Sequence, residues 1–213
     1  MRKLKFLFSL LMLICFSVGT VFADDYVKVT SAPTDWSGDY LIVYEGDATH
    51  DTVAFNGGLT TIDANSNKIS VTIKDGKIAA NSTTNAAKFT IATMTGGYSI
   101  KAANGKYIGA TSYANSLVAS ESAIANSLSL DASGNAVIGV TIGTSGTVTL
   151  RYNYANNTWR FRYYKSGQQA IKLYKLTASA SPSVSVEKNG SAITELNFGE
   201  YEPAAGYKSL TFA

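Results

Sequence analysis

The chain has 213 residues, of which 18 are Lys or Arg, 15 are Asp or Glu and one is Cys, with a formal net charge of +3. Three of the basic residues and Cys15 lie in the first 23 residues, so the rest of the chain has 15 charges of each sign and no thiol. A neutral chain has no general attraction for nucleic acid or a membrane surface, and a chain without cysteine has no disulfide, thiolate metal site or cysteine nucleophile.

The first 23 residues have the parts of a cleavable secretory signal in the order that export requires. A basic start is followed by an apolar run over 6–22, and Val21 and Ala23 place small residues at the −3 and −1 positions of a cleavage site. We therefore expect a signal peptide over 1–23 and a mature chain that is secreted or displayed at the cell surface, or held in the periplasm. The alternatives are an uncleaved membrane anchor and, at Cys15, a lipoprotein, although Ile14 stands where a lipoprotein has a small residue.

From residue 34 to residue 181 the chain contains no proline and has the pattern of successive short β-strands. Its segments alternate polar and apolar residues and are separated by turn-forming pairs such as Asp75-Gly76, which is typical of half-buried antiparallel strands. About twelve strands are expected, and no amphipathic helix is evident. The clearest segments are 40–44, 69–74, 88–93, 98–102, 128–131, 137–142, 148–153, 159–164 and 171–176.

Residues 24–176 are expected to form one all-β domain, either a β-trefoil-like barrel or a β-sandwich. Stretches that begin at Gly38, Gly96 and Gly146 each continue into a strand, a turn and another strand, and their starts lie 58 and 50 residues apart. This loose threefold repeat favours the trefoil, which is built from three similar units. The sandwich is the alternative.

A domain boundary is expected after residue 176. Residues 177–183 (TASASPS) form a run of small residues that is interrupted by Pro182, which is typical of a linker. Strand-like patterns return within 184–213, a stretch too short for a complete sandwich. We interpret it as the truncated start of a second β domain, of Ig-like type.

The sequence gives little support to catalysis. His50 is the only histidine, and Asp47 and Asp51 flank it, so a carboxylate-oriented base is conceivable; a loop histidine without a role is the simpler interpretation. The G-x-S-x-G, H-E-x-x-H and P-loop motifs are absent. The stretch 131–135 alternates oxygen-bearing side chains but lacks the terminal Glu of a calcium loop. We expect no enzyme activity, no catalytic residue, no metal and no cofactor.

Residues 148–164 predict a β-hairpin that turns at Asn156-Asn157. Its register places rings and leucine on one face, which is more often core than binding platform. The facing pairs there are Tyr154 with Trp159, Tyr152 with Phe161, and Leu150 with Tyr163.

The other face of this hairpin is polar, and Arg151 lies directly opposite Arg162. Like charges at facing positions destabilise a sheet, so a compensating group is expected. It is either a bound anion such as an acidic sugar, which suits the planar arginine fork, or a neighbouring carboxylate, or solvent. Tyr113 and Tyr164 are expected to be available for stacking on sugar rings. The candidate ligand-binding residues are Arg151, Asn153, Arg160, Arg162 and Tyr164.

Three stretches resemble a known family. GDYLIVYEG (38–46), NAAKFTIATMTGGYSIKAANGKYIGA (85–110) and WRFRYYKSGQQAIKLYKL (159–176) are similar to a β-trefoil-like accessory module of large secreted and surface proteins of Bacteroides-type bacteria. The resemblance covers about residues 26–176 and implies a non-catalytic module, with any catalytic domain elsewhere. The repeated Gln-x-Trp motif of lectin-type trefoils is absent, so no binding residue is transferred.

The sequence thus predicts a secreted, non-catalytic binding module that attaches to a glycan or another extracellular partner. No nucleic-acid partner is evident, and no membrane contact is expected after signal cleavage. Two alternatives stay open: an accessory domain of a larger extracellular hydrolase or nuclease, and a structural spacer without a ligand.

Overall fold

The computed structural model describes residues 24–155, 157–177, 187–188 and 191–192, and the chain divides into two units, Met1–Ser179 and Ala180–Ala213. The predicted signal peptide, nearly all of the predicted linker and most of the predicted second domain lie outside the described residues. In the second unit, β15 (Glu187–Lys188) and β16 (Ser191–Ala192) pair in antiparallel fashion.

The described part of the first unit contains fourteen β-strands and one short helix, which confirms the all-β class. Its elements are β1 (Asp25–Lys28), β2 (Gly38–Tyr44), β3 (Val53–Phe55), β4 (Lys68–Ser70), β5 (Lys77–Ala79), α2 (Ser82–Ala86), β6 (Phe89–Met94), β7 (Gly97–Ala102), β8 (Tyr107–Gly109), β9 (Val118–Ser120), β10 (Ser127–Leu130), β11 (Ala136–Ile142), β12 (Gly146–Asn153), β13 (Arg160–Tyr164) and β14 (Lys172–Thr177).

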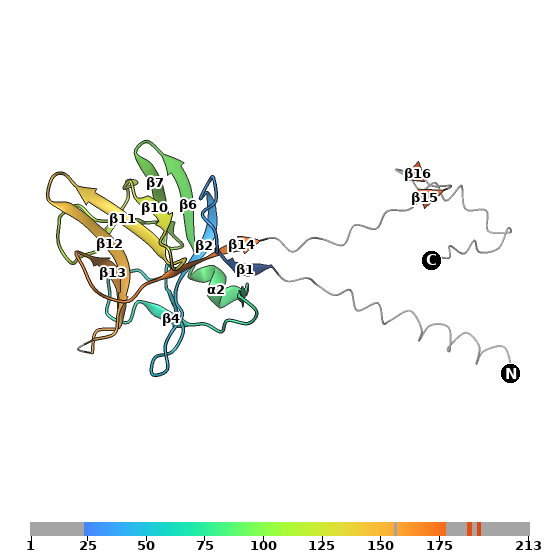
Figure 1. Ribbon diagram of the computed structural model, residues 1–213, viewed down its shortest axis with the longest axis horizontal. Helices are drawn as coiled ribbons and strands as arrows, with labels where there is room; N and C mark the ends of the chain where they lie inside the picture. Colours follow the sequence, from blue (N-terminus) through green and yellow to red (C-terminus); the bar gives the residue numbers. More distant parts are fainter. Residues whose placement is uncertain (1–23, 156, 178–186, 189–190, 193–213) are drawn as a thin grey trace. The chain divides into compact units, whose positions relative to one another are not determined.

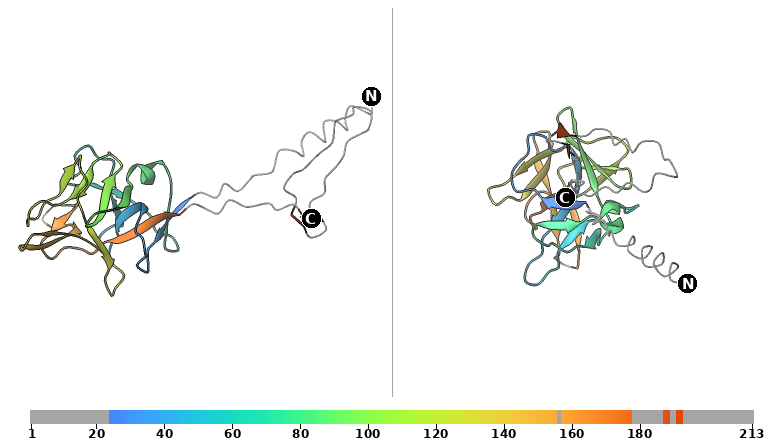
Figure 2. Two further views of the ribbon diagram at one scale, coloured as in Figure 1. Left: turned by 90° about the horizontal axis from the view of Figure 1, so that it is seen from above. Right: turned by 90° about the vertical axis from the view of Figure 1, so that its right-hand side faces the viewer.

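The strands of the first unit form two antiparallel sheets. Ten of them form one sheet in the order β5-β1-β14-β2-β6-β7-β8-β9, with β3 attached to β2 and β4 to β3. The other sheet has the order β10-β11-β12-β13 and lies on the left of the module in Figure 1, with β2, β6 and β7 on the right. Two further views show the same two groups of strands (Figure 2).

The described sheets do not close into a barrel, so the favoured trefoil barrel gives way to the sandwich-like alternative. Only isolated bridges connect the sheets, among them Tyr98 with Asn126 and Ser116 with Tyr163. The two backbones lie close together at the bridge between Tyr98 and Asn126. A Cβ atom on the neighbouring Gly97 would lie only 2.4 Å from the Asn126 carbonyl oxygen, so a side chain there would clash. Gly97 also has a φ of +145°, a conformation that other residues rarely adopt.

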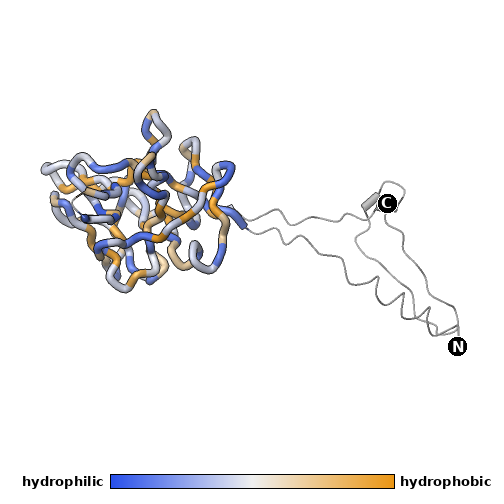
Figure 3. Tube along the Cα trace, turned by 90° about the horizontal axis from the view of Figure 1, so that it is seen from below, coloured by the Kyte–Doolittle hydropathy of each residue, from blue (hydrophilic) through white to orange (hydrophobic). Residues whose placement is uncertain are grey.

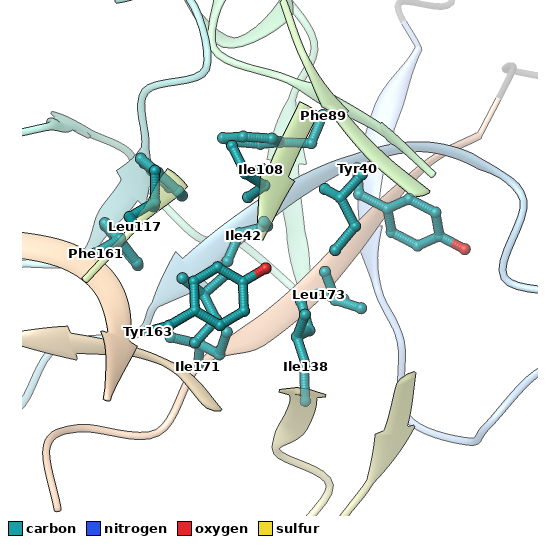
Figure 4. Packing of buried hydrophobic residues seen from close by; sticks show 14 of the residues in the cluster. Tyr40, Ile42, Phe89, Ile108, Leu117, Ile138, Phe161, Tyr163, Ile171 and Leu173 are labelled. Carbon is teal, nitrogen blue, oxygen red and sulfur yellow. The ribbon is translucent and has the colours of Figure 1, made fainter. Parts of the chain in front are cut away.

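The main hydrophobic core lies between the two sheets. Along β12 every second residue is buried, as expected for a strand with one face in the core. Side chains from both sheets meet there, including Ile42 of β2, Ile138 of β11 and Leu173 of β14 (Figure 4). Hydrophobic and hydrophilic residues alternate along the trace, as Figure 3 shows.

A second hydrophobic cluster covers the opposite face of the larger sheet. The last five residues of β2 are all buried, because Leu41 and Val43 point into the second cluster while Tyr40, Ile42 and Tyr44 point into the main core. Strand β2 is therefore buried on both faces, whereas the sequence pattern predicted strands with only one face buried.

Within the described residues, no helix has the length and apolar character needed to cross a membrane.

Candidate functional site

Strands β12 and β13 form the predicted hairpin in the predicted register. Leu150 pairs with Tyr163, and Tyr152 with Phe161, and all four side chains are at most 1% exposed. The aromatic face of the hairpin is thus mainly core, as expected, because its rings complete the contact between the two sheets. Arg151 faces Arg162 on the other side, and this arginine face carries all three arginines that follow residue 23.

Asp63 supplies the charge that the facing arginines need. The Arg162 guanidinium donates through Nε to Asp63 Oδ1 at 2.7 Å and through Nη2 to Asp63 Oδ2 at 2.5 Å. Its Nη1 donates to the Asn115 carbonyl oxygen at 3.1 Å. The hydrogen bonds to Asp63 raise the pKa of Arg162. Of the three compensating groups expected from the sequence, the structure provides the neighbouring carboxylate.

Asp63 nevertheless pairs with only one of the two facing guanidinium groups, that of Arg162. Arg151 is partly exposed, and its side chain makes no hydrogen bond or ion pair within the described residues. Next along the same face, the Asn153 side chain accepts a hydrogen bond from the Ala155 backbone at 3.0 Å and so shapes the start of the turn. Opposite Asn153, the Nε of Arg160 is buried and has no hydrogen-bond partner in the described part of the chain.

Tyr164 differs from the expectation. It is 6% exposed, so its ring cannot stack on a ligand, whereas Tyr113 is 41% exposed, as expected. Burial raises the pKa of the Tyr164 hydroxyl, against the opposite influence of the nearby Arg160 and Arg162 charges. The structure therefore places Arg151, Asn153, Arg160 and Arg162 on one face and assigns Tyr164 to the interior beside it.

A second group of side chains gathers at the turn end of the hairpin. The rings of His50 and Tyr154 are stacked, with centroids 3.6 Å apart and planes 15° apart. The Trp159 ring lies 5.8 Å from His50, and the Lys68 ammonium lies 5.7 Å from the Trp159 centroid. We call His50, Tyr154 and Trp159 the ring cluster. All three side chains are partly exposed.

Asp47 orients the ring cluster. Its Oδ1 accepts hydrogen bonds from the backbone and hydroxyl of Thr49, both at 2.8 Å. His50 Nδ1 lies 2.9 Å from the same oxygen. The hydroxyl groups of Tyr44 and Tyr154 donate to Oδ2 at 2.8 and 3.3 Å. Hydrogen bonds from Thr49 and His50, then Tyr44, hold the pKa of Asp47 far below its ordinary range. Asp47 is therefore ionised at neutral pH.

This arrangement determines the tautomer of His50. An ionised carboxylate only accepts hydrogen bonds, so His50 Nδ1 carries the proton that faces Asp47. In the neutral ring Nε2 is then an acceptor. No described residue bonds to Nε2, and it is not among the buried atoms without a partner, so its lone pair reaches solvent.

The sequence shows the carboxylates that flank His50, but it does not indicate that Tyr154 and Trp159 lie beside the His50 ring. Tyr154 and Trp159 lie more than 100 residues away, and no local pattern connects them to Asp47 and His50. The spacing Asp-x-Thr at 47–49 was the available signal, since an aspartate often accepts a hydrogen bond from the backbone two residues later.

A cavity of about 700 Å³ adjoins the loop that carries Asp47 and His50. Lys28 and Glu45 form an ion pair in its wall at 2.7 Å, and the Tyr174 hydroxyl donates to Glu45 at 2.6 Å. Burial and this hydrogen bond raise the pKa of Tyr174. Because Lys28 and Glu45 satisfy each other, these two charges offer little to a charged ligand in the cavity. Its remaining lining residues are Asp51, Thr52, Ser70, Val71, Thr72, Ile73 and Gly76.

Among the described residues, no three His, Cys, Asp or Glu side chains lie close enough together to hold a metal ion.

No protein-family model matches the chain, and no match was found among the curated proteins or the solved structures. The sites are therefore interpreted from their own geometry.

Proposed function

We propose that this chain is a secreted, non-catalytic binding module that attaches to an extracellular glycan through the arginine face of the β12–β13 hairpin. The observation that carries the proposal is the unequal charge of that face. Arg151 and Arg162 are directly opposite, and Asp63 pairs with Arg162 alone. A ligand carboxylate or sulfate beside Arg151 would restore the balance. The signal-like pattern of residues 1–23 supports export.

The chemistry of the face favours an acidic glycan. The planar arginine fork binds carboxylate and sulfate through two parallel hydrogen bonds, which gives direction as well as attraction. Arg151 has no such partner within the described residues. Asn153 and Arg160 form the next facing pair on the same face of the ladder, so additional polar groups lie beside Arg151.

An array of acidic and neutral glycans, probed with the full chain, tests this proposal. We expect binding to carboxylated or sulfated glycans that weakens as salt is raised, since salt screens exposed charges. Arg151→Gln should lower the affinity by about 10-fold to 100-fold, as expected when a charge-assisted hydrogen bond of about 1.5–3 kcal/mol is lost.

Lys74→Gln is the matched control, because it removes one exposed positive charge outside the hairpin. It should leave binding unchanged. The absence of binding to every glycan would contradict the proposal, and equal losses in both variants would reduce it to a general effect of net charge.

A further inference from the structure

We propose that the ring cluster is a second carbohydrate contact, which stacks on the apolar face of a neutral pyranose ring while His50 Nε2 accepts a hydrogen bond from a sugar hydroxyl. The inference rests on the proposed function only in placing the ligand among glycans. Its residues lie on the opposite face of the hairpin from Arg151, so the two contacts can be tested separately.

The first argument is the position of the rings. Tyr154 and Trp159 lie just outside the last paired positions of the hairpin, Asn153 and Arg160. They continue the row of rings that begins in the core with Tyr152, which is 1% exposed. Beyond the ladder the row is only partly covered, so two large rings at the edge of the core keep part of their surface exposed.

The second argument is that the rings are held in place before any ligand arrives. His50 stacks on Tyr154, and the Tyr154 hydroxyl bonds to Asp47 at 3.3 Å. The Trp159 backbone donates to the Asn65 side chain at 3.0 Å. A ring that is already ordered loses less conformational freedom on binding, which favours affinity from a small contact. Amphipathic rings of this type suit the apolar face of a sugar.

The third argument is the acceptor at His50 Nε2. In the neutral His50 ring, Asp47 holds the proton on Nδ1, which leaves the Nε2 lone pair free for a donor from solvent. Sugar hydroxyls are such donors. The carboxylate itself has little capacity left, because it already accepts hydrogen bonds from four residues. A neutral hydroxyl at His50 therefore fits better than a cation at Asp47.

A nucleic-acid base would also stack on these rings. The ionised Asp47 carboxylate beside them disfavours a phosphate backbone, and Lys68 is the only cation that the described contacts place over the cluster. We therefore assign the cluster to a neutral sugar and treat a single-stranded oligonucleotide as the competing ligand in the experiment.

The experiment uses tryptophan fluorescence of the full chain carrying Trp36→Phe, so that Trp159 is the only tryptophan left. We expect neutral oligosaccharides of glucose, xylose or mannose to change the emission in a saturable way. His50→Phe retains a ring against Tyr154 but removes the acceptor, and should lower the affinity about fivefold, as for one net hydrogen bond of about 1 kcal/mol. Trp159→Ala should lower the affinity for the sugar about tenfold. Because this variant lacks the fluorescent tryptophan, calorimetry measures its binding.

Tyr107→Ala is the matched control, since it removes another partly exposed ring that has a lysine ammonium over it, as Trp159 has, and it should leave neutral-sugar binding unchanged. If Trp159→Ala unfolds, the His50→Phe result and the emission titration still decide. A saturable response to oligothymidylate but to no sugar would overturn the assignment, as would unchanged emission with every neutral oligosaccharide.

The two proposals fail in different ways. Arg151→Gln should retain neutral-sugar binding, and Trp159→Ala should retain binding to acidic glycans. Binding of acidic glycans together with no response at Trp159 would remove this inference and leave the proposed function standing. No binding of any glycan by either method would remove both.

Discussion

Asn67 has no exposed surface, and its side chain takes the place of a neighbouring strand at the edge of β13. Its Oδ1 accepts from the Phe161 backbone N–H at 2.8 Å, and its Nδ2 donates to the Phe161 carbonyl at 2.9 Å. The same Nδ2 donates to the Ile62 carbonyl at 2.8 Å. One amide therefore joins the loop before β4 to a strand nearly 100 residues later.

Asn67→Ala should lower the free energy of unfolding by roughly 3 kcal/mol. Buried backbone groups of Phe161 and Ile62 would lose their partner, and each such loss costs about 1–3 kcal/mol. Denaturation by urea at 25 °C measures the change. Asn65→Ala is the control: Asn65 also bonds to the hairpin but is exposed, so water replaces its contacts and the loss should stay below about 1 kcal/mol. Equal losses in the two variants would contradict the role given to burial.

Individual side chains were partly predictable from the sequence. The facing positions of Arg151 and Arg162 followed from the hairpin alone, because period-two alternation and a turn determine register. The pairing of Arg162 with Asp63 could not be predicted in the same way, since the carboxylate comes from a different element. The burial of Tyr164 was missed for a related reason: whether the edge of a strand is covered depends on segments that the strand pattern does not contain.

At the scale of elements, β13 is the last strand of its sheet, and its outer edge is covered by loops instead of a fifth strand. Asn67 lies on one part of this edge, and the Ser116 backbone bonds to the Tyr163 carbonyl at 3.1 Å on another. Asp63 and Asn115, from the same two loops, hold Arg162. The hairpin is therefore fastened by its polar face as well as by its buried rings.

Asp63→Asn should lower the free energy of unfolding by about 1 kcal/mol, because the partly exposed ion pair is lost and two like charges then face each other. Adding Arg151→Gln to Asp63→Asn should recover part of the loss, whereas Arg151→Gln alone should have little effect. Thermal denaturation of the four proteins gives the coupling between the two positions. Strictly additive effects would show that the facing arginines do not interact.

Sequence patterns do not predict the short helix of this fold. Helix α2 has five residues and no amphipathic stripe, so hydrophobic periodicity could not reveal it. Its start depends on a capping box, in which the Asn81 side chain accepts from the Thr84 backbone at 3.0 Å and Thr84 Oγ1 accepts from the Asn81 backbone at 2.9 Å. An Asn followed three residues later by Thr is too common a spacing to predict a helix alone.

At the scale of the whole molecule, several exposed aspartates begin turns by accepting a backbone N–H two residues later. Asp35 accepts from Ser37 at 3.0 Å, and Asp131 accepts from Ser133 at 2.9 Å. The bonds from Ser37 lower the pKa of Asp35, and bonds from Asn135 and Ser133 lower that of Asp131. Each carboxyl therefore binds a proton less readily in the folded chain than in the unfolded chain.

Acid should consequently destabilise the fold. The contribution of these carboxylates is complete above about pH 4, the ordinary aspartate pKa, and is lost as the pH falls towards their lower folded values. Asp35→Asn/Asp131→Asn keeps an acceptor in each turn without the charge, so its melting temperature should fall less steeply between about pH 4 and pH 2 than that of the unaltered chain.

The class of fold was predictable, whereas its sandwich-like architecture was expected only as the alternative to a trefoil barrel. Alternation and turn residues identify antiparallel strands locally, and the structure confirms both the strands and their antiparallel pairing. The choice between barrel and sandwich depends on which distant strands pair. Strand β1 lies between β5 and β14, and nothing in the pattern of residues 25–28 indicates either neighbour. The loose repeat of Gly38, Gly96 and Gly146 suggested a threefold symmetry that the two sheets do not display as a closed barrel.

The pairing of β1 with β14 also determines how the module would respond to a pulling force. Asp25 lies opposite Thr177, so tension applied at these two residues would act first on one end of the ladder. Its hydrogen bonds would break one pair at a time, as in a zipper, instead of sharing the load along the strand. Once β14 peels away, Leu173 leaves the main core and Tyr174 leaves the second cluster. Tension on Asp25 and Thr177 would therefore open the ladder between β1 and β14 first, although both strands lie inside the larger sheet.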